Sequence, residues 1–526
     1  MSDENNHPTK RPFRLFTGWL LFFACFALLY FATEQRGVGW QDSGGFQAAA
    51  LVPAKEYVAE HAVNGNLALV HPSYVALARA VASFFRDSPA RAVNAVSSIC
   101  MAATVANVWL LSLLAFARGR RLCAAMAATL FGMAHMPWWM ATIAEVYATS
   151  ALMLSTELLI FLCALKDWGN VRFAAGLSAR EVRGFAYVLL AATTGLHFSI
   201  HGFAILAWPV YAVTFIWQAV RHEVSWKIAP MALFVWLLGL LPVSSLVAAR
   251  AQVTSLTEAL ANLLVGNAWA EEVLLIGQQW RGFFLANMGI FSLNFLNPAW
   301  ILAGIGLCAA RSRVATAVRL ILAFHFVFFI RYLVADQATF AIPTLLLFSL
   351  FAAEGMCRLK TTRMTSALLL TATVLIPPVS YVAVNEVLHR IYPAAAMQKV
   401  STPLRDDIRY WILPWKHDED SAERFAEEVA ATTEDNAVIV ADITTGDALK
   451  SFFLANPASR GHRKFGMTLT SLVDYPDPSL PLQSVLNRNR DRPWYVARPF
   501  PGYVPDRGFL DCKYEKCGSL YRMKRE

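Results

Sequence analysis

Long apolar blocks are the feature of this sequence that most limits its fold. Residues 15–31, 231–249 and 368–384 contain no Asp, Glu, Lys or Arg. A helix rises about 1.5 Å per residue, so it needs about 20 apolar residues to cross a bilayer core of about 30 Å. Each block approaches that length, and the chain is 56% hydrophobic and only 16% charged. The sequence therefore predicts an all-α polytopic membrane protein.

These blocks alternate with short polar loops along most of the chain. We expect about eleven transmembrane helices, at residues 15–33, 92–117, 121–137, 146–165, 184–200, 203–220, 228–249, 298–310, 314–334, 338–357 and 364–384. The first block follows basic residues, as the apolar part of a signal peptide does, but no convincing small-residue cleavage site comes after it. We therefore interpret it as an uncleaved first helix.

Basic residues gather on one predicted side of the membrane, at residues 10–14, 118–121, 166–183, 221–227, 311–319 and 358–363. Cytoplasmic loops are enriched in Lys and Arg, whereas the predicted opposite loops at 138–145, 200–203 and 335–338 contain neither. This pattern predicts a cytoplasmic N-terminus, and the short loops favour a bacterial inner membrane. It also accounts for the net charge of +9, so we expect no nucleic-acid partner.

The predicted topology leaves two long outer loops and a polar tail. The loops cover residues 34–91 and 250–297 of a membrane domain that spans residues 1–385, and the segment 71–85 in the first loop is expected to lie as a helix in the interface. Residues 386–526 are predicted to form a small extracytoplasmic α/β domain. Its helices are expected at residues 421–431 and 446–454, and its strands at residues 437–441, 494–497 and 519–523.

Cysteines do not follow a metal-binding or redox pattern. Most of the eight cysteines lie in or beside apolar blocks and are expected to be packing residues. Cys512 and Cys517 lie in the polar tail, where a disulfide can form if the tail faces an oxidising compartment. The sequence leaves that question open.

Asp42 is the first candidate catalytic residue. It lies in the glycine-rich stretch 39–46, just beyond the first predicted span. One interpretation makes it a general base that takes a proton from an acceptor hydroxyl. The competing structural interpretation makes it the N-cap of a helix that starts near Gly44.

Glu145 is the second candidate, at the outer mouth of an apolar helix. It is either a second catalytic carboxylate or a residue that caps the helix after it. The neighbouring Trp138 and Trp139 are typical of an interfacial aromatic belt. We expect Tyr147, two residues after Glu145, to contact substrate.

Cationic and imidazole groups on the outer side are candidates for binding a phosphate. His71 opens the segment predicted to lie in the interface, and His197 and His201 share one helix face at a spacing that also suits two metal ligands. Arg331 lies inside a predicted span, where a charge is costly and usually has a function. It could bind phosphate, snorkel to the surface, or pair with Asp336.

Taken together, these segments resemble the GT-C superfamily of membrane glycosyltransferases, and most closely its protein O-mannosyltransferase-like branch. The resemblance covers most of the chain. It rests on residues 40–46 (WQDSGGF), 71–72 (HP), 131–147, 195–196 with His201, 336–355 and 440–448 (VADITTGDA).

The resemblance implies transfer of a sugar from an undecaprenyl- or dolichyl-phosphate carrier, with Asp42 and Glu145 as the acidic catalytic residues. The acceptor, whether protein, lipid or glycan, is not implied. The chemistry requires no metal, although a divalent metal stays open. The chain departs from the family pattern at Gly45, where an acidic residue is typical, and at Ser73, where a second proline is common. Two other functions are kept as alternatives: a non-catalytic factor for envelope-polysaccharide assembly on the same fold, and a transporter.

Overall fold

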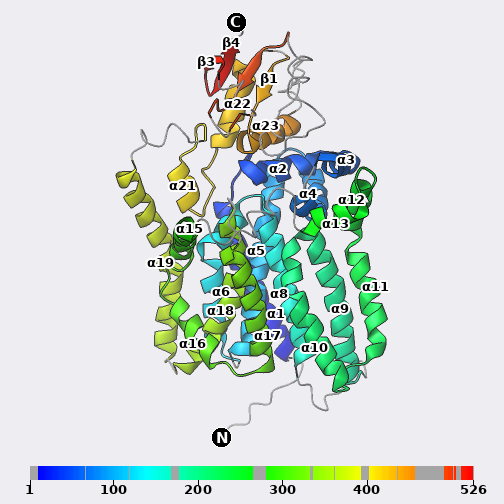
Figure 1. Cartoon of the computed structure of the whole chain (residues 1–526). Helices are drawn as coiled ribbons and strands as arrows, with labels where there is room; N and C mark the ends of the chain where they lie inside the picture. The colour runs from blue at the N-terminus through cyan, green and yellow to red at the C-terminus, as the bar shows by residue number, and fades with distance from the viewer. Residues whose placement is uncertain are drawn as a thin grey trace.

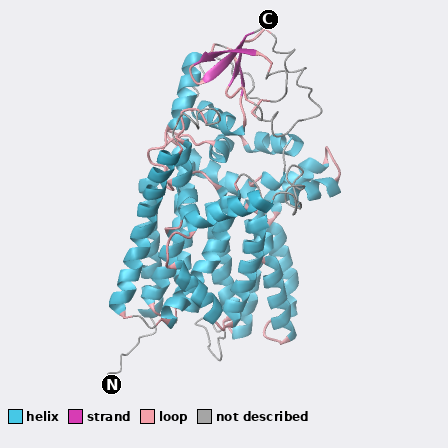
Figure 2. Cartoon of the chain, turned by 60° about the vertical axis from the view of Figure 1, so that its left-hand side comes forward, coloured by secondary structure: helices cyan, strands magenta, loops and turns pink. Residues whose placement is uncertain are grey.

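A computed structural model shows a helical bundle with a small mixed domain at one end (Figures 1 and 2). It describes residues 10–64, 67–117, 119–166, 177–264, 280–331, 336–359, 362–392, 402–434, 436–456, 491–500, 503–504 and 511–524. The strands are confined to the end of the molecule where the C-terminus lies, and the N-terminus lies at the opposite end.

Long helices form the body of the bundle. They are α1 (Lys10–Thr33), α5 (Pro89–Leu111) with the π-helical turn Ser112–Phe116, α6 (Arg121–Gly132), α8 (Val146–Leu165), α9 (Ala179–Ile200), α10 (Trp208–Val220), α11 (Ala229–Gly239), α12 (Leu241–Ala251), α16 (Trp300–Ala309), α17 (Arg313–Arg331), α18 (Ala341–Arg358) and α19 (Arg363–Ile391). Their inward faces bury aliphatic and aromatic side chains in one continuous core, in which α5, α6 and α18 are almost wholly buried.

Six helical segments among the described residues are long and apolar enough to cross a membrane. The number becomes seven if α11 and α12 form one span, since the chain bends by 64° between them. Pro242 in the first turn of α12 explains a break there, because proline cannot continue the hydrogen bonds of the preceding helix. The expected number of about eleven is therefore not confirmed, because α6, α9, α10 and α16 are not among these segments.

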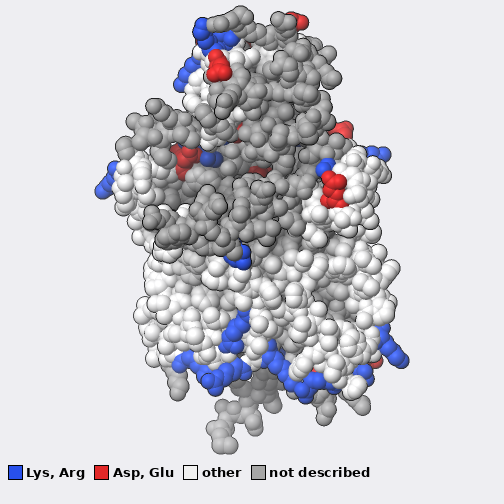
Figure 3. Space-filling view, in the orientation of Figure 1, with Lys and Arg blue, Asp and Glu red and all other residues white. Residues whose placement is uncertain are grey.

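Basic loops far apart in the sequence meet at the N-terminal end of the bundle. Glu223 lies 3.7 Å from both Arg183 and Arg313, and Arg120 donates to the carbonyl of Cys357 over 3.3 Å. Figure 3 shows Lys and Arg side chains gathered along this lower rim. Among the described residues, Arg120, Arg183 and Arg313 of three separate clusters thus lie at one end of the bundle, as predicted.

Shorter elements complete the membrane domain. They are α2 (Gln41–Leu51), α3 (Ala54–Asn64), the 3-10 turn Leu67–Leu69, α4 (Pro72–Phe84), α7 (His135–Thr142), the 3-10 turns Gly202–Leu206, Trp226–Ile228 and Gln337–Phe340, α13 (Leu256–Leu264) and α15 (Trp280–Asn294). Helices α2, α3 and α4 lie at the upper end of the bundle, beneath the tail (Figure 1). The helix expected at residues 71–85 is present as α4 and buries Tyr74, Ala78 and Ala82 on one face.

The tail forms a four-stranded sheet with helices. After α21 (Asp407–Ile412), its elements are α22 (Ser421–Thr432), β1 (Val438–Val440), α23 (Ile443–Ala455), β2 (Trp494–Val496), β3 (Lys513–Cys517) and β4 (Leu520–Lys524). The strand order is β1-β2-β4-β3, with β1 and β2 parallel and the other pairs antiparallel. Both expected helices and all three expected strands of the tail are confirmed, and β3 is an addition.

No disulfide joins the cysteines in the part of the chain that the structure describes. Cys517 ends strand β3 and Cys512 immediately precedes it. A strand rises about 3.3 Å per residue, so the two Cα atoms lie about 16 Å apart, far beyond the roughly 7 Å that a disulfide can span. The possible Cys512–Cys517 disulfide is therefore wrong for this fold.

Candidate functional site

Asp42 lies at the start of the helix beneath the tail. Helix α2 begins at Gln41, so the exposed Asp42 side chain belongs to its first turn. Trp40 holds the N-cap position, which excludes the alternative that Asp42 caps a helix starting near Gly44. Gln41 has a φ of 53°, a left-handed conformation that costs a non-glycine residue on the order of 1–3 kcal/mol and is found mostly where function requires it.

Two glycines of α2 let the tail approach this turn closely. A Cβ atom on Gly44 would lie 2.9 Å from the backbone of Asp447 and Ala448 in α23. A Cβ atom on Gly45 would lie 2.9 Å from Oδ2 of Asp447. The tail thus brings a carboxylate against position 45, where the family resemblance leads one to expect an acidic side chain.

Glu145 lies between α7 and α8, with its backbone fixed by Ser97. The Ser97 hydroxyl accepts from the Glu145 amide over 3.0 Å and donates to the Glu145 carbonyl over 3.1 Å. Although Glu145 holds the N-cap position of α8, its side chain makes no capping hydrogen bond. The residue is only 7% exposed, and its buried Oε2 has no hydrogen-bond partner. The capping role proposed from the sequence therefore does not explain this side chain.

Asp42, Glu145 and Asp336 form what we term the outer acid cluster. Burial, and then the negative charges of Asp42 and Asp336, raise the pKa of the Glu145 carboxyl well above its usual range. Burial also raises the pKa of Asp336. Mutual repulsion in a buried setting favours a protonated Glu145, which can then donate a hydrogen bond.

Tyr147 connects the outer acid cluster to the histidines. Its hydroxyl donates to Oδ2 of Asp336 over 2.6 Å, and its ring lies 5.2 Å from that of His201. Arg331 ends α17, five residues before Asp336, and its side chain is exposed. The sequence suggested that Arg331 pairs with Asp336, whereas in the structure the partner of Asp336 is Tyr147.

His71 and His201 stack on each other beside this tyrosine. Their ring centroids are 5.1 Å apart and the rings are almost parallel. Nδ1 of His71 donates to the carbonyl of Ile200 over 2.8 Å, and Nδ1 of His201 accepts from the amide of Phe203 over 3.1 Å. These bonds fix both rings, so the candidate residues Asp42, Glu145, Tyr147, His71 and His201 gather in one region.

A buried polar chain lies below the stacked histidines. Nδ1 of His197 pairs with Glu157 over 2.8 Å, its Nε2 bonds to Ser150 over 2.8 Å, and Glu157 also accepts from Tyr211 over 3.2 Å. Both ring nitrogens of His197 are occupied, so His197 and His201 do not form a pair of metal ligands. Within the described residues, no three His, Cys, Asp or Glu side chains are arranged to hold a metal ion.

The chain after the last span folds back over α7. The carbonyl of Ile412 bonds to His135 over 3.0 Å, and that of Pro414 accepts from Thr142 over 2.8 Å. Trp138 and Trp139 are consequently buried, against Trp415 and Trp411 respectively. The expectation of an interfacial aromatic belt at these two residues is wrong, because the returning chain covers them.

Sequence reasoning missed two cations that this segment places over the site. Arg405 lies above the ring of Tyr410, and the ammonium of Lys416 lies 4.7 Å from the same ring. Burial lowers the pKa of Lys416 to about 7. A signal was present in the stretch 405–411 (RDDIRYW), where four charged residues are followed by two aromatic residues shortly after the last span.

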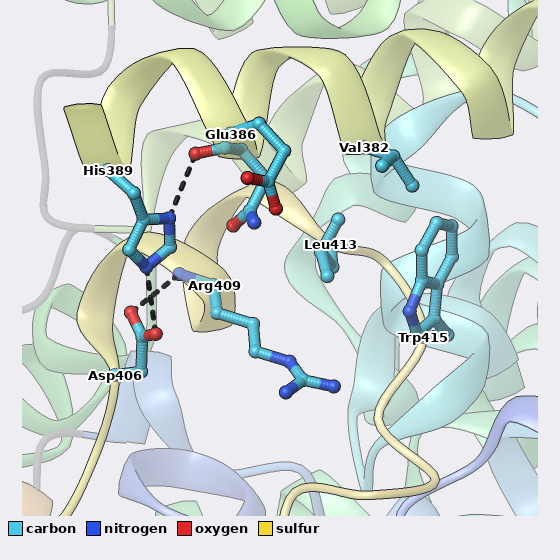
Figure 4. Close-up of a pocket in the computed structure, with 8 residues that line it drawn as sticks. Val382, Glu386, His389, Asp406, Arg409, Leu413 and Trp415 are labelled. Atoms are coloured by element: carbon cyan, nitrogen blue, oxygen red, sulfur yellow. Dashed lines mark hydrogen bonds and ion pairs between the residues drawn. The ribbon is translucent and has the colours of Figure 1, made fainter. Parts of the chain in front are cut away.

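A groove of about 570 Å³ lies on the other side of α21 (Figure 4). It is lined by Val382, Asn385, Glu386, His389, Asp406, Arg409, Leu413 and Trp415. His389 pairs with Asp406 over 2.9 Å, and Arg409 reaches into the groove and pairs with Asp418. Helix α21 thus turns Arg409 toward the groove and Tyr410 toward Trp139 above the acid cluster.

No protein-family model matches the sequence, and no curated protein matches it. Solved structures do match. ArnT from Cupriavidus metallidurans bound to undecaprenyl phosphate is similar with a TM-score of 0.57 at 12% identity, over 96% of this chain and 98% of that one. ArnT in the apo state is similar with a TM-score of 0.55 at 13% identity, with the same coverage. This chain is therefore an integral membrane protein with the fold of ArnT along almost its whole length.

Proposed function

We propose that this protein is a GT-C glycosyltransferase that moves a sugar from a polyprenyl-phosphate carrier to an acceptor hydroxyl at the outer face of the membrane. The observation that carries the proposal is the outer acid cluster, which lies where the bundle meets the tail. Its setting supports the same function, because ArnT is a GT-C glycosyltransferase and one of its structures holds undecaprenyl phosphate. Acid groups and a lipid phosphate would meet at this boundary.

Asp42 acts as the general base in this proposal. It accepts the proton of the acceptor hydroxyl while the acceptor oxygen forms a bond to the anomeric carbon of the sugar. The bond from that carbon to the carrier phosphate breaks, and its electron pair leaves with the phosphate oxygen. Asp42 suits this role because it is the exposed member of the outer acid cluster.

Glu145 contributes a hydrogen bond rather than a second base. Its buried carboxyl retains a proton, so it can donate to the substrate from Oε2, which has no partner in the protein. Tyr147, His71 and His201 orient the sugar and the phosphate, since their rings and hydrogen bonds are fixed. Arg331 offers a cation to the phosphate from the end of α17.

The proposed orientation places the N-terminus in the cytoplasm of a bacterium and the tail outside its inner membrane. The basic rim at the N-terminal end of the bundle supports this orientation, since Lys and Arg are enriched on the cytoplasmic side. We retain about eleven spans in a membrane domain of residues 1–385, followed by an extracytoplasmic domain of residues 386–526. Helix α19 runs on to Ile391, so it connects the two.

The resemblance to the O-mannosyltransferase-like branch makes mannose the first sugar to test. The direct test uses purified full-length protein in lipid, a panel of radiolabelled polyprenyl-phosphate sugars and candidate acceptors. Wild-type protein should transfer one sugar, and Asp42→Asn should abolish transfer while inserting normally. Parallel reactions with EDTA, Mg²⁺ and Mn²⁺ examine metal dependence.

Other results would favour the alternatives. Equal transfer by wild-type protein and Asp42→Asn would remove Asp42 as the base. Absence of transfer from every donor and acceptor, with carrier binding intact, would favour the assembly-factor function. Uptake of a sugar or its lipid carrier by vesicles without a new glycosidic bond would favour a transporter.

A further inference from the structure

Arg405 is a buried cation of the tail, enclosed by aromatic rings. Its side chain is only 5% exposed. The guanidinium carbon lies 4.2 Å from the ring centroid of Tyr410 and 5.9 Å from those of Trp40 and Trp411. Arginine does not lose its proton in proteins, so a full positive charge is held in this aromatic pocket.

The hydrogen bonds of this guanidinium are incomplete. Its Nε donates to Asp407 over 2.5 Å, whereas its Nη1 is buried and has no hydrogen-bond partner. A buried donor without an acceptor is costly, and more so when it is charged. An unsatisfied buried group in a native protein calls for an explanation, such as a catalytic role or a bound ion.

Two independent contacts place Arg405 beside the outer acid cluster. Trp40, one wall of its pocket, is two residues before Asp42 and is tied to the tail through Ser421 over 2.8 Å. Tyr410, the ring beneath the guanidinium, lies close enough to Asp42 and Glu145 to feel their charges. The cation therefore lies in the same region of the molecule as the carboxylates.

We propose that Arg405 binds the phosphate of the polyprenyl carrier through its unpartnered Nη1. This inference rests on the proposed function and identifies the tail as part of the binding site. When the bond between sugar and phosphate breaks, its electron pair adds negative charge to the phosphate oxygen. A desolvated guanidinium matches that charge with strong, directional hydrogen bonds, and it offsets the repulsion from the carboxylates nearby.

Binding of the carrier alone tests the inference. Purified full-length wild-type protein, Arg405→Gln and Arg405→Lys are compared for binding of undecaprenyl phosphate and of undecaprenol, which has the same chain but no phosphate. Arg405→Gln should weaken undecaprenyl phosphate binding roughly 10- to 100-fold and leave undecaprenol binding unchanged. Arg405→Lys, which keeps the charge without the planar fork, should fall between.

Arg409→Gln is the matched control. Arg409 lies in α21, four residues after Arg405, but faces the groove of Figure 4 and pairs with Asp418. It should bind undecaprenyl phosphate as the wild type does. Equal affinity of wild type and Arg405→Gln for undecaprenyl phosphate would overturn the inference, as would an equal loss of both lipids, which indicates a structural role.

The proposed function has a separate failure. If wild-type protein discriminates undecaprenyl phosphate from undecaprenol through Arg405 but transfers no sugar, the phosphate site stands and the glycosyltransferase proposal fails. If wild-type protein does not discriminate the two lipids, Arg405 has no phosphate to bind and this inference fails, whatever the transfer assay gives.

Discussion

The carboxylate of Asp447 in tail helix α23 packs against Gly45 of α2, so that its Oδ2 atom lies 2.9 Å from the position that a Cβ atom on Gly45 would occupy. Helices α2 and α23 thus pack closely because α2 has glycines, Gly44 and Gly45, at the contact. Helix α2, which contains Asp42, therefore packs against the tail. The position of the proposed base therefore depends on the packing of two parts of the chain that are about 400 residues apart in the sequence.

Substitution of Gly44 should disturb this packing. In Gly44→Ala the new Cβ meets backbone atoms of Asp447 and Ala448, which cannot rotate away. We expect a loss of about 1–3 kcal/mol in stability and a marked loss of transfer, measured by thermal unfolding and by sugar transfer. Gly304→Ala is the control, because a Cβ there meets no atom within 4 Å. Full activity of Gly44→Ala would show that the α2–α23 contact does not position Asp42.

The buried Glu145 should make stability depend on pH. Its folded-state pKa is raised, so between about pH 4.5 and that raised pKa the folded state binds more protons than the unfolded state, and stability falls as pH rises. Glu145→Gln imitates the protonated form and should lack this fall. Thermal midpoints from pH 4.5 to 7.5 check the difference, with the exposed Glu434→Gln as control. Parallel curves for wild type and Glu145→Gln would contradict the raised pKa.

Lys416 should make stability rise with pH, which is the opposite of the effect of Glu145. Its folded pKa is about 7, below the ordinary value of 10.5, so between pH 7 and 10.5 the unfolded state binds more protons and stability rises with pH. Lys416→Met should remove this rise between pH 7 and 9. Lys524→Met, at an exposed lysine of β4, should retain it. A rise that persists in Lys416→Met must come from another group.

Loss of the Tyr147 hydroxyl should lower the rate of sugar transfer. Tyr147→Phe leaves the carboxylate of Asp336 without its 2.6 Å donor, which should cost about 1.5–3 kcal/mol and lower the transfer rate. Tyr187→Phe is matched, since it removes a 2.9 Å bond to Gln218 elsewhere; it should lower stability but not transfer. Equal transfer rates in both variants would remove Tyr147 from the site.

The tail was predictable because its sequence follows simple patterns. Residues 437–441 (AVIVA) are apolar enough to be a buried strand, and residues 421–431 have the spacing of an amphipathic helix. Strand β3 was missed because three of the five residues of its sequence, KYEKC, are charged and the strand is mostly exposed. It is defined by pairing with β4, which local sequence does not reveal.

The candidate site was predictable only in part. Asp42 and Glu145 stand out because each carboxylate follows or precedes an apolar span. Arg405 does not, because its importance comes from aromatic rings contributed by residues 40, 410 and 411 of two separate segments. The burial of Trp138 and Trp139 likewise depends on a chain return that no local pattern announces.

The return of the tail onto α2 has a consequence for the making of the protein. Asp42 leaves the ribosome early, whereas Arg405, Ser421 and Asp447 are among the last parts to be synthesised. The proposed site is complete only when the tail has been synthesised and has packed against α2. Contacts between segments this distant in sequence form slowly. In the proposed enzyme, a chain that stops before Arg405 would lack the tail contacts of α2 and would not complete the site.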